Sequence, residues 1–307
     1  MVNDMPARDT SYESVAMREL DQHNITDVAL EQMAGTSDQR LKEIMDEAVR
    51  HMHAFARKVD LRPDELLKGL LFLTAVGQKC TPHRQEFILL SEVLGLETVV
   101  NILNDLRDAE RGTRTSILGP FHVDEPPWLE LGASLYPQAK DHEIALYGRV
   151  TDSAGAGLSD AIVEIWQTDE EGLYDVQRHE ELDLRGRFRV DAEGRYFLRT
   201  IRPLGYSIPM DGPVGDLIRA QGRHGMRPAH IHFIVRAPKF RGVTTAVYLK
   251  NDQYIESDTV FGVTESLTRD IIANDPDSPF PELASLRFDF TLNRMNEPAR
   301  LAGSSGR

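Results

Sequence analysis

Cysteine is almost absent from this chain, which has one, Cys80, among 307 residues. One cysteine cannot form a disulfide within the chain or build a cysteine-based zinc site, and such scarcity suits a reducing compartment. No apolar run is long enough to cross a bilayer, and no basic segment followed by an apolar one marks the first residues. We therefore expect a protein that is neither secreted nor inserted in a membrane, and we place it in the cytoplasm.

Positive charge is also in short supply. The chain has 35 basic and 49 acidic residues, a formal net charge of −14, and no cluster of lysine and arginine. Nucleic-acid-binding proteins usually present a basic patch to the phosphate backbone, so a nucleic acid is not an expected partner. The hydrophobic content of 41% is ordinary for a globular protein, and the length allows one large domain or two.

The first third of the chain is predicted to be helical. Residues 1–36 are polar without clear periodicity and are expected to form an N-terminal tail. Residues 37–111 form a predicted helical domain, because apolar residues recur there at three- and four-residue steps and a proline followed by two acids marks one helix start. The predicted helices cover residues 41–59, 62–76, 85–93 and 96–106.

The rest of the chain is predicted to be β. Residues 112–140 form a glycine- and proline-containing connection, and long ordered connections often carry function. Short alternating runs follow, separated by turn sequences. Seven such strands predict an antiparallel β-sandwich over residues 112–307, so the fold is expected to be mainly β with a helical N-terminal part. The predicted strands cover residues 144–151, 161–167, 187–190, 195–200, 230–236, 244–249 and 286–292.

Two histidines form the clearest candidate site. His230 and His232 alternate with Ile231 and Phe233, as in a strand where residues two apart share a face. Pro228 fits the beginning of a strand, where its missing N–H does least harm. Neutral imidazole is the commonest metal ligand in proteins, so the pair predicts a shared metal ion. The alternative is a pair of polar residues on a half-wet face of a sheet.

The other ligands of such a site must come from elsewhere. No acid follows His232 closely, as a site with two histidines and one carboxylate would require, and the other eight histidines are scattered. Tyrosine is the remaining candidate, because trivalent iron binds phenolate. Tyr174 and Tyr206 each lie in a glycine-containing loop. Spacing does not say which of the eight tyrosines bind, and packing in or around the core is the alternative role of each.

A set of short motifs resembles those of the intradiol ring-cleavage dioxygenases. They occur in the same order as in that family, and the resemblance runs from about residue 40 to the last strand. Other stretches are most similar to the members that cleave hydroxyquinol, and the catechol-cleaving members come second. The family motifs are residues 146–150, 161–167, 172–174, 185–187, 194–196, 205–206 and 227–232, and the hydroxyquinol-like stretches are 116–123, 208–215 and 257–263.

The resemblance implies an enzyme that opens an aromatic ring between two adjacent hydroxylated carbons with O2. It implies Fe(3+) bound by Tyr174, Tyr206, His230 and His232 and by a hydroxide. Tyr206 would be catalytic as the ligand that leaves when substrate binds, and Arg227 as a fixed cation beside the ring. The implied pocket residues are Leu89, Glu92, Ile117, Leu118, Gly119, Pro120, Phe121, Ile208, Pro209, Arg227 and Val260.

Two positions bear on the substrate. Glu92 could accept a hydrogen bond from the third hydroxyl of hydroxyquinol, and leaving such an acceptor unpaired would penalise catechol; a solvated carboxylate on a helix is the alternative. Ala246 stands where the catechol-cleaving enzymes carry a glutamine, so hydrogen bonding near the metal is expected to differ. The favoured reaction gives 3-hydroxy-cis,cis-muconate and then maleylacetate, and cleavage of catechol or a substituted catechol to cis,cis-muconate comes second.

The resemblance also implies a homodimer formed through the N-terminal helices, with a phospholipid held between the subunits. Periodicity by itself indicates only an apolar face. A hypothesis from another class is a metal-free β-sandwich that serves as a binding module. The presence of all four ligand residues argues against it. A zinc hydrolase is a weaker hypothesis, because zinc sites use nitrogen, sulfur and carboxylate ligands.

Overall fold

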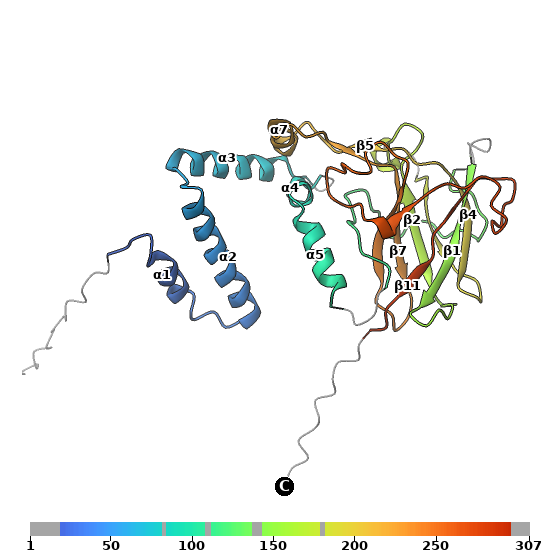
Figure 1. Cartoon of the computed structure of the whole chain (residues 1–307), viewed down its shortest axis with the longest axis horizontal. Helices are drawn as coiled ribbons and strands as arrows, with labels where there is room; N and C mark the ends of the chain where they lie inside the picture. The colour runs from blue at the N-terminus through green and yellow to red at the C-terminus, as the bar shows by residue number, and fades with distance from the viewer. Residues whose placement is uncertain (1–18, 82–83, 108–111, 137–142, 179–181, 296–307) are drawn as a thin grey trace, which may run out of the picture. The chain divides into compact units, whose positions relative to one another are not determined.

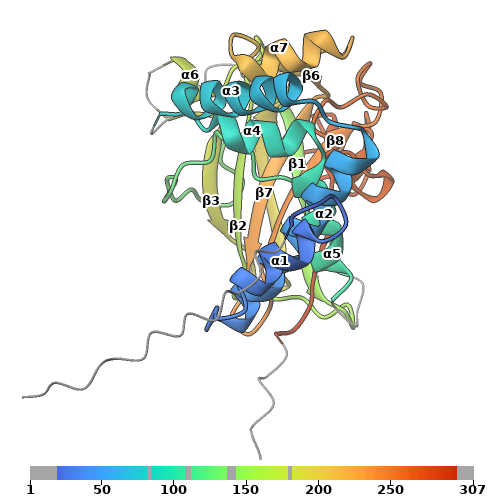
Figure 2. The ribbon, with the colours of Figure 1, turned by 90° about the vertical axis from the view of Figure 1, so that its left-hand side faces the viewer.

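The computed structural model describes residues 19–81, 84–107, 112–136, 143–178 and 182–295 (Figures 1 and 2). The chain divides into two compact units, residues 1–72 and 73–307, and helix α3 (Pro63–Lys79) contributes to both. None of the helices in the described stretches is long and apolar enough to cross a membrane.

The described part of the first unit, residues 19–72, is mainly helical. Helix α2 (Gln39–Lys58) confirms the predicted helix, and the Asp38 side chain caps it by accepting hydrogen bonds from two backbone N–H groups of its first turn. Helix α1 (Ile25–Gln32) was not predicted. It is held by contacts with α2, since Thr26 Oγ1 lies 3.1 Å from His53 Nδ1 and Arg57 donates to the Gln22 carbonyl at 3.2 Å. Such distant contacts leave no periodic pattern in the sequence.

The second unit has helices on one side of a β-sandwich. Helices α4 and α5 confirm two predictions, and Gly95 separates them with a φ of +72°, which favours glycine. Helix α7 was not predicted, and its first turn donates a backbone hydrogen bond from Val214 to the buried Glu86 carboxylate at 3.2 Å. The helices are α4 (Glu86–Val93), α5 (Leu96–Asp105), α6 (Asp175–Arg178), α7 (Pro213–Ala220) and the 3₁₀ helix Glu265–Leu267.

Five strands form the sheet that carries the two histidines. Their order is β3-β2-β7-β8-β9, and α4 and α5 lie beside the outer face of this sheet (Figures 1 and 2). Every predicted strand in this sheet is confirmed, and β9 was not predicted. The strands are β2 (Ile162–Gln167), β3 (Arg185–Arg189), β7 (His230–Arg236), β8 (Val243–Leu249) and β9 (Thr268–Arg269).

The second sheet centres on the longest strand. Strand β1 pairs with β4 along one edge and with β10 and β11 along the other, and a separate two-stranded sheet joins β5 to β6. The last predicted strand is therefore two short ones. The strands are β1 (Glu143–Asp152), β4 (Arg195–Ile201), β5 (Tyr206–Ser207), β6 (Met226–Arg227), β10 (Ser285–Arg287) and β11 (Phe290–Leu292).

The predicted β-sandwich with a helical N-terminal part is confirmed, but its sheets are mixed and not antiparallel throughout. Strand β1 runs parallel to β10 and β11, and β8 runs parallel to β9. Alternation along one strand reveals which face is buried but not the direction of the neighbouring strand, so the sequence pattern could not predict these pairs.

The core lies between the two larger sheets. Ile231, Phe233 and Val235 of β7 are fully buried there, and the Phe233 ring lies 5.0 Å from that of Phe290 in β11. Burying each such side chain contributes roughly 1.5–3 kcal/mol. Because side chains alternate along β7, this packing turns His230 and His232 toward the outer face of the sheet.

Candidate metal centre and substrate pocket

The four predicted ligands converge on one buried place. His230 and His232 come from β7, Tyr206 from β5, and Tyr174 from the residue just before α6 (Asp175–Arg178). Tyr174 is fully buried, both histidines are 1% exposed, and Tyr206 is 6% exposed. Strands and short loops of one unit therefore bring together side chains that lie up to 58 positions apart in the sequence.

The distances between these side chains fit a single ion. The two histidine Nε2 atoms are 3.1 Å apart, and Tyr174 Oη lies 3.4 Å from His230 Nε2. The rings of Tyr174 and Tyr206 meet edge to face, with centroids 5.4 Å apart. With imidazole–metal bonds of about 2.1 Å, two ligands at right angles on one ion would be about 3 Å apart, close to the separation of the histidines.

The protonation of the histidines also fits ligation. The Nδ1 atom of His230 lies 2.6 Å from the Pro228 carbonyl oxygen and donates to it, which leaves the Nε2 lone pair facing the cluster. Burial lowers the pKa of both imidazoles well below its usual value, and the Arg227 charge lowers it further. Both rings are therefore neutral, as metal ligands must be.

Phenols are the oxygen donors that the structure places beside the two histidines. The residues that the structure describes contain no group of three or more His, Cys, Asp or Glu able to hold a metal ion. Burial raises the pKa of Tyr174 and Tyr206 above the usual value for a phenol even though the Arg227 charge opposes the shift, so both phenols keep their protons at neutral pH. A strongly charged ion could reverse that balance, and two histidines with two phenols suit trivalent iron better than zinc.

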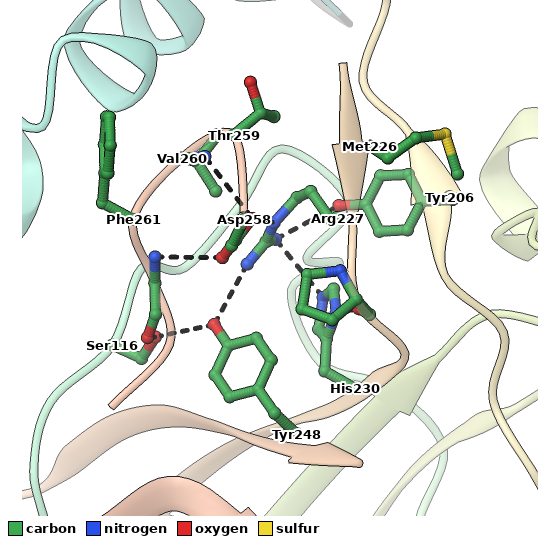
Figure 3. A network of polar contacts seen from close by, with 12 residues as sticks. Ser116, Tyr206, Met226, Arg227, His230, Tyr248, Asp258, Thr259, Val260 and Phe261 are labelled. Atoms are coloured by element: carbon green, nitrogen blue, oxygen red, sulfur yellow. Dashed lines mark hydrogen bonds and ion pairs between the residues drawn. The ribbon is translucent and has the colours of Figure 1, made fainter. Parts of the chain in front are cut away.

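Arg227 is the cation at the edge of this cluster (Figure 3). It is 1% exposed, and its Nη1 atom lies 3.3 Å from both Tyr206 Oη and His230 Nε2. Its Nε atom donates to Asp258 at 3.2 Å, and its Nη2 atom donates to Tyr248 at 3.0 Å. The guanidinium is therefore fixed on three sides and turns one nitrogen toward the predicted ligands.

A cavity of about 150 Å³ adjoins the cluster. Phe121 connects the two, because its ring stacks on Tyr174 with centroids 4.5 Å apart and also lines the cavity. A cavity of this size suits one small aromatic ring. Its lining residues are Arg84, Gln85, Glu86, Ile88, Leu89, Glu92, Pro120, Phe121, Gln177 and Pro209.

Glu92 is the most informative residue of the cavity wall. The residue is 3% exposed, and its Oε1 atom has no hydrogen-bond partner among the described residues. Burial raises the pKa of this carboxyl to about 7, although the Arg227 charge opposes the shift. The carboxyl is therefore available to pair with a polar group that enters the cavity, and the alternative of a solvated carboxylate is wrong.

The raised pKa of Glu92 leads to a prediction about how the stability of the iron-free protein depends on pH. Glu92 holds its proton more tightly when folded, with a pKa of about 7 against 4.5 unfolded, so the free energy of unfolding falls as the pH rises from about 5 to 8. The E92Q variant has no carboxyl at this position, so its free energy of unfolding should not fall in this way. Compared with the wild type, its free energy of unfolding should therefore rise by about 2 to 3 kcal/mol between pH 5 and pH 8. Urea unfolding at both pH values measures the change. The same difference at both values would contradict the shifted pKa.

The remaining predicted pocket residues lie around the cluster in different ways. Ile117, Ile208 and Val260 are buried but do not line the cavity, and the Leu118 side chain is 38% exposed. Gly119 faces His232, where an added Cβ would meet the ring at 3.6 Å, and its φ of +71° favours glycine. Their contact with substrate stays a prediction.

Several side chains around the ligands were missed. Tyr248 follows Ala246 by two positions on β8 and so shares the histidine face, a signal that was available in the sequence. Trp166 is paired with His232 across strands, and the two rings stack with centroids 4.8 Å apart. Asp258 and Ser116 reach this region from distant loops. Both lie in the hydroxyquinol-like stretches of the sequence, but nothing in those stretches indicated their contacts around Arg227.

Ala246 lies directly opposite His232 and is fully buried. A methyl group there donates no hydrogen bond, and His232 Nδ1 has no partner among the residues that the structure describes. The expected difference in hydrogen bonding from the catechol-cleaving enzymes stays a prediction, and this cross-strand pair is the place to look for it.

Two family models match the chain. The model described as dioxygenase matches residues 134–294, and the model described as catechol dioxygenase N terminus matches residues 38–112. The 6-chlorohydroxyquinol 1,2-dioxygenase of Cupriavidus pinatubonensis is 44% identical over 280 residues, which cover 90% of this chain and 99% of that protein. The hydroxyquinol 1,2-dioxygenase of a Rhizobium species is 40% identical over 247 residues, which cover 80% of this chain and 83% of that protein.

Solved structures agree. Hydroxyquinol 1,2-dioxygenase from Pseudomonas putida is similar with a TM-score of 0.82 and 36% identity, covering 89% of this chain and 99% of that one. Catechol 1,2-dioxygenase from Acinetobacter radioresistens is similar with a TM-score of 0.77 and 27% identity, covering 94% of this chain and 98% of that one. This chain therefore belongs to the intradiol ring-cleavage dioxygenases, as its motifs predicted.

Proposed function

We propose that this dioxygenase cleaves hydroxyquinol (1,2,4-trihydroxybenzene) between its adjacent hydroxylated carbons with O2. The product would be 3-hydroxy-cis,cis-muconate, which tautomerises to maleylacetate. The observation that carries the proposal is the buried Glu92 carboxyl, which has an unpaired oxygen and lies on the cavity beside the ligand cluster. The relatives named for hydroxyquinol and 6-chlorohydroxyquinol support the same substrate class.

Non-haem iron is the metal used by this family, and we propose Fe(3+) in this chain. Tyr174, Tyr206, His230 and His232 would hold it, because two neutral imidazoles and two phenols converge there within a few ångströms. When bound, ferric iron would draw electron density from a chelated aromatic diol and make the ring reactive toward O2.

The residues around the site have separate roles in this proposal. Tyr206 Oη, which lies 3.3 Å from Arg227 Nη1, would take one of the two protons that the substrate hydroxyls lose. Arg227 would stabilise the negative charge that develops on the ring. Pro120 and Phe121 would form an apolar wall of the cavity that excludes water from the ring.

Glu92 would distinguish hydroxyquinol from catechol. If it binds the third hydroxyl, E92Q should lower kcat/KM for hydroxyquinol by roughly 10- to 100-fold, the range for a hydrogen bond to a charged group. Catechol lacks that hydroxyl, so its kcat/KM should change less than about threefold. O2 uptake with each substrate measures the two kcat/KM values and hence their ratio.

The control for E92Q is E282Q. Glu282 is an exposed glutamate that does not line the cavity. Its replacement should leave the ratio of kcat/KM for the two substrates unchanged. Equal losses on both substrates in E92Q would remove Glu92 from substrate recognition.

The wild-type protein gives the direct test of the substrate. Parallel O2 uptake should favour hydroxyquinol over catechol, with one O2 consumed per ring and maleylacetate formed. A preference for catechol would support the second candidate, catechol or substituted-catechol cleavage, which the likeness to a catechol 1,2-dioxygenase favours. Turnover of neither substrate by the iron-loaded protein would contradict both.

We also propose a homodimer formed through the N-terminal helices. Helix α2 has no buried residue, and five of its apolar residues are 40–58% exposed, so a second subunit could cover them. A phospholipid between the subunits, the cytoplasmic location and the division into a tail (1–36), a helical domain (37–111) and a catalytic domain (112–307) stay predictions. The exposed residues of this face are Leu41, Ile44, Met45, Met52 and Phe55.

A further inference from the structure

The Arg227 guanidinium belongs to a closed ring of polar contacts (Figure 3). Asp258 Oδ1 accepts from Arg227 Nε at 3.2 Å, and Asp258 Oδ2 accepts from the Gly262 backbone N–H at 3.0 Å. The Gly262 carbonyl accepts from Ser116 Oγ at 3.2 Å. Ser116 Oγ lies 3.1 Å from Tyr248 Oη, which accepts from Arg227 Nη2 at 3.0 Å. The ring joins β6, β8 and two loops.

All the charged members of this ring are buried. The side chains of Arg227 and Asp258 are each 2% exposed, and Asp258 is the one carboxylate paired with Arg227 among the described residues. A buried guanidinium without a counter-charge is costly, so Asp258 strongly restricts where Arg227 can lie. Gly262 closes the ring because a Cβ there would overlap the Tyr248 hydroxyl.

The loop that carries Asp258 is itself held in place. Phe261 has a φ of +58°, which is unfavourable for a residue with a side chain. Arg223 donates to the Thr259 carbonyl at 2.7 Å, and its guanidinium lies 5.0 Å from the Phe261 ring centroid. Thr98 of α5 donates to the Phe261 carbonyl at 3.2 Å. These contacts keep the carboxylate fixed relative to the sheet.

The ring determines which nitrogen is left for the site. Asp258 takes Nε and Tyr248 takes Nη2, so Nη1 alone faces Tyr206 Oη and His230 Nε2, at 3.3 Å from each. We propose that Asp258 is a positioning residue, which acts with Tyr248 to orient Arg227 toward the predicted iron ligand Tyr206 and the reacting ring. This inference rests on the proposed function, because it assigns the residue that makes Arg227 effective.

The experiment is a double-mutant cycle on the full-length, iron-loaded protein. D258N removes the counter-charge with little change in shape. It should lower kcat for hydroxyquinol by roughly 10- to 100-fold with KM changed less than about threefold, and it should shift the phenolate-to-iron absorption band of the resting protein. In the R227Q background, D258N should change neither kcat nor the band further, because the residue it acts through is gone.

A second variant keeps the proposal testable if D258N folds poorly. Y248F removes one hydroxyl and keeps the ring, and it should lower kcat by roughly 3- to 10-fold, again with no further effect in the R227Q background. The control is S257A, because exposed Ser257 precedes Asp258 and contacts His224 outside the ring of contacts. It should behave as the wild type.

The cycle has outcomes that would overturn the inference. Additive effects of D258N and R227Q on kcat and on the band, or a rise in KM alone, would show that Asp258 does not act through Arg227. If the wild type binds iron and cleaves hydroxyquinol in that case, the proposed function stands without this inference. A wild type that binds no iron or leaves hydroxyquinol intact would contradict the proposed function itself, and the inference with it.

Discussion

H230A is expected to lose its iron and, with it, ring cleavage. His230 Nε2 lies at the centre of the cluster, 3.1 Å from His232 Nε2 and 3.4 Å from Tyr174 Oη. Loss of a residue that only supports a metal ligand typically costs 10- to 100-fold in metal affinity, so loss of a ligand should cost more than about 100-fold. Iron per chain after purification and O2 uptake with hydroxyquinol measure both effects.

The matched control for H230A is H224A. His224 is exposed and contacts Ser257 at 3.0 Å, away from the cluster, so this variant should keep wild-type iron and turnover. Comparing H230A with H224A distinguishes the loss of a metal ligand from the loss of a histidine elsewhere in the chain. An H230A protein that retains a full complement of iron would remove His230 from the site.

R227Q is expected to keep its iron and lose roughly 100- to 1,000-fold in kcat. Arg227 lies next to Tyr206 and His230 without being a predicted ligand. Removing one fixed group that stabilises developing negative charge has an effect of this size in other enzymes. The variant also leaves Asp258 without its counter-charge, which should lower the free energy of unfolding by about 3–5 kcal/mol. Single-turnover cleavage of hydroxyquinol at low temperature separates the chemical step from unfolding.

The control for R227Q is R236Q. Arg236 lies at the end of β7, and its side chain is 58% exposed and pairs with Glu164 at 3.3 Å. Removing this arginine should leave kcat and stability close to those of the wild type. An R227Q protein with wild-type turnover would show that the ring needs no fixed cation, and a colourless one would show that Arg227 is required to bind iron.

The sequence predicted the histidine face of β7 well, for a physical reason. Ile231 and Phe233 pack in the core, so His230 and His232 must point the opposite way. The alternation of histidine and apolar residues in the sequence indicates this orientation directly. Most helix and strand bounds followed from the same periodicities. The parallel pairs of β1 and β8 did not, because alternation along a strand carries no direction.

The parts of the site that the sequence did not predict depend on contacts between distant segments. Asp258 and Ser116 belong to one ring of contacts only because two loops and two strands close around Arg227. Tyr174 and Tyr206 were candidates among eight tyrosines until the family motifs singled them out. The cavity beside Glu92 forms between α4, α6 and the neighbouring loops, and no local pattern encodes such a space.

The visible absorption spectrum of the purified protein tests the central claim most directly. If Tyr174 and Tyr206 bind ferric iron, the resting protein should be red-brown, with a broad phenolate-to-iron band that disappears when the iron is reduced or removed and returns when ferric iron is restored. A protein that holds one iron per chain and shows no such band would contradict the phenolate ligands. A protein that binds no iron after reconstitution would contradict the metal centre altogether.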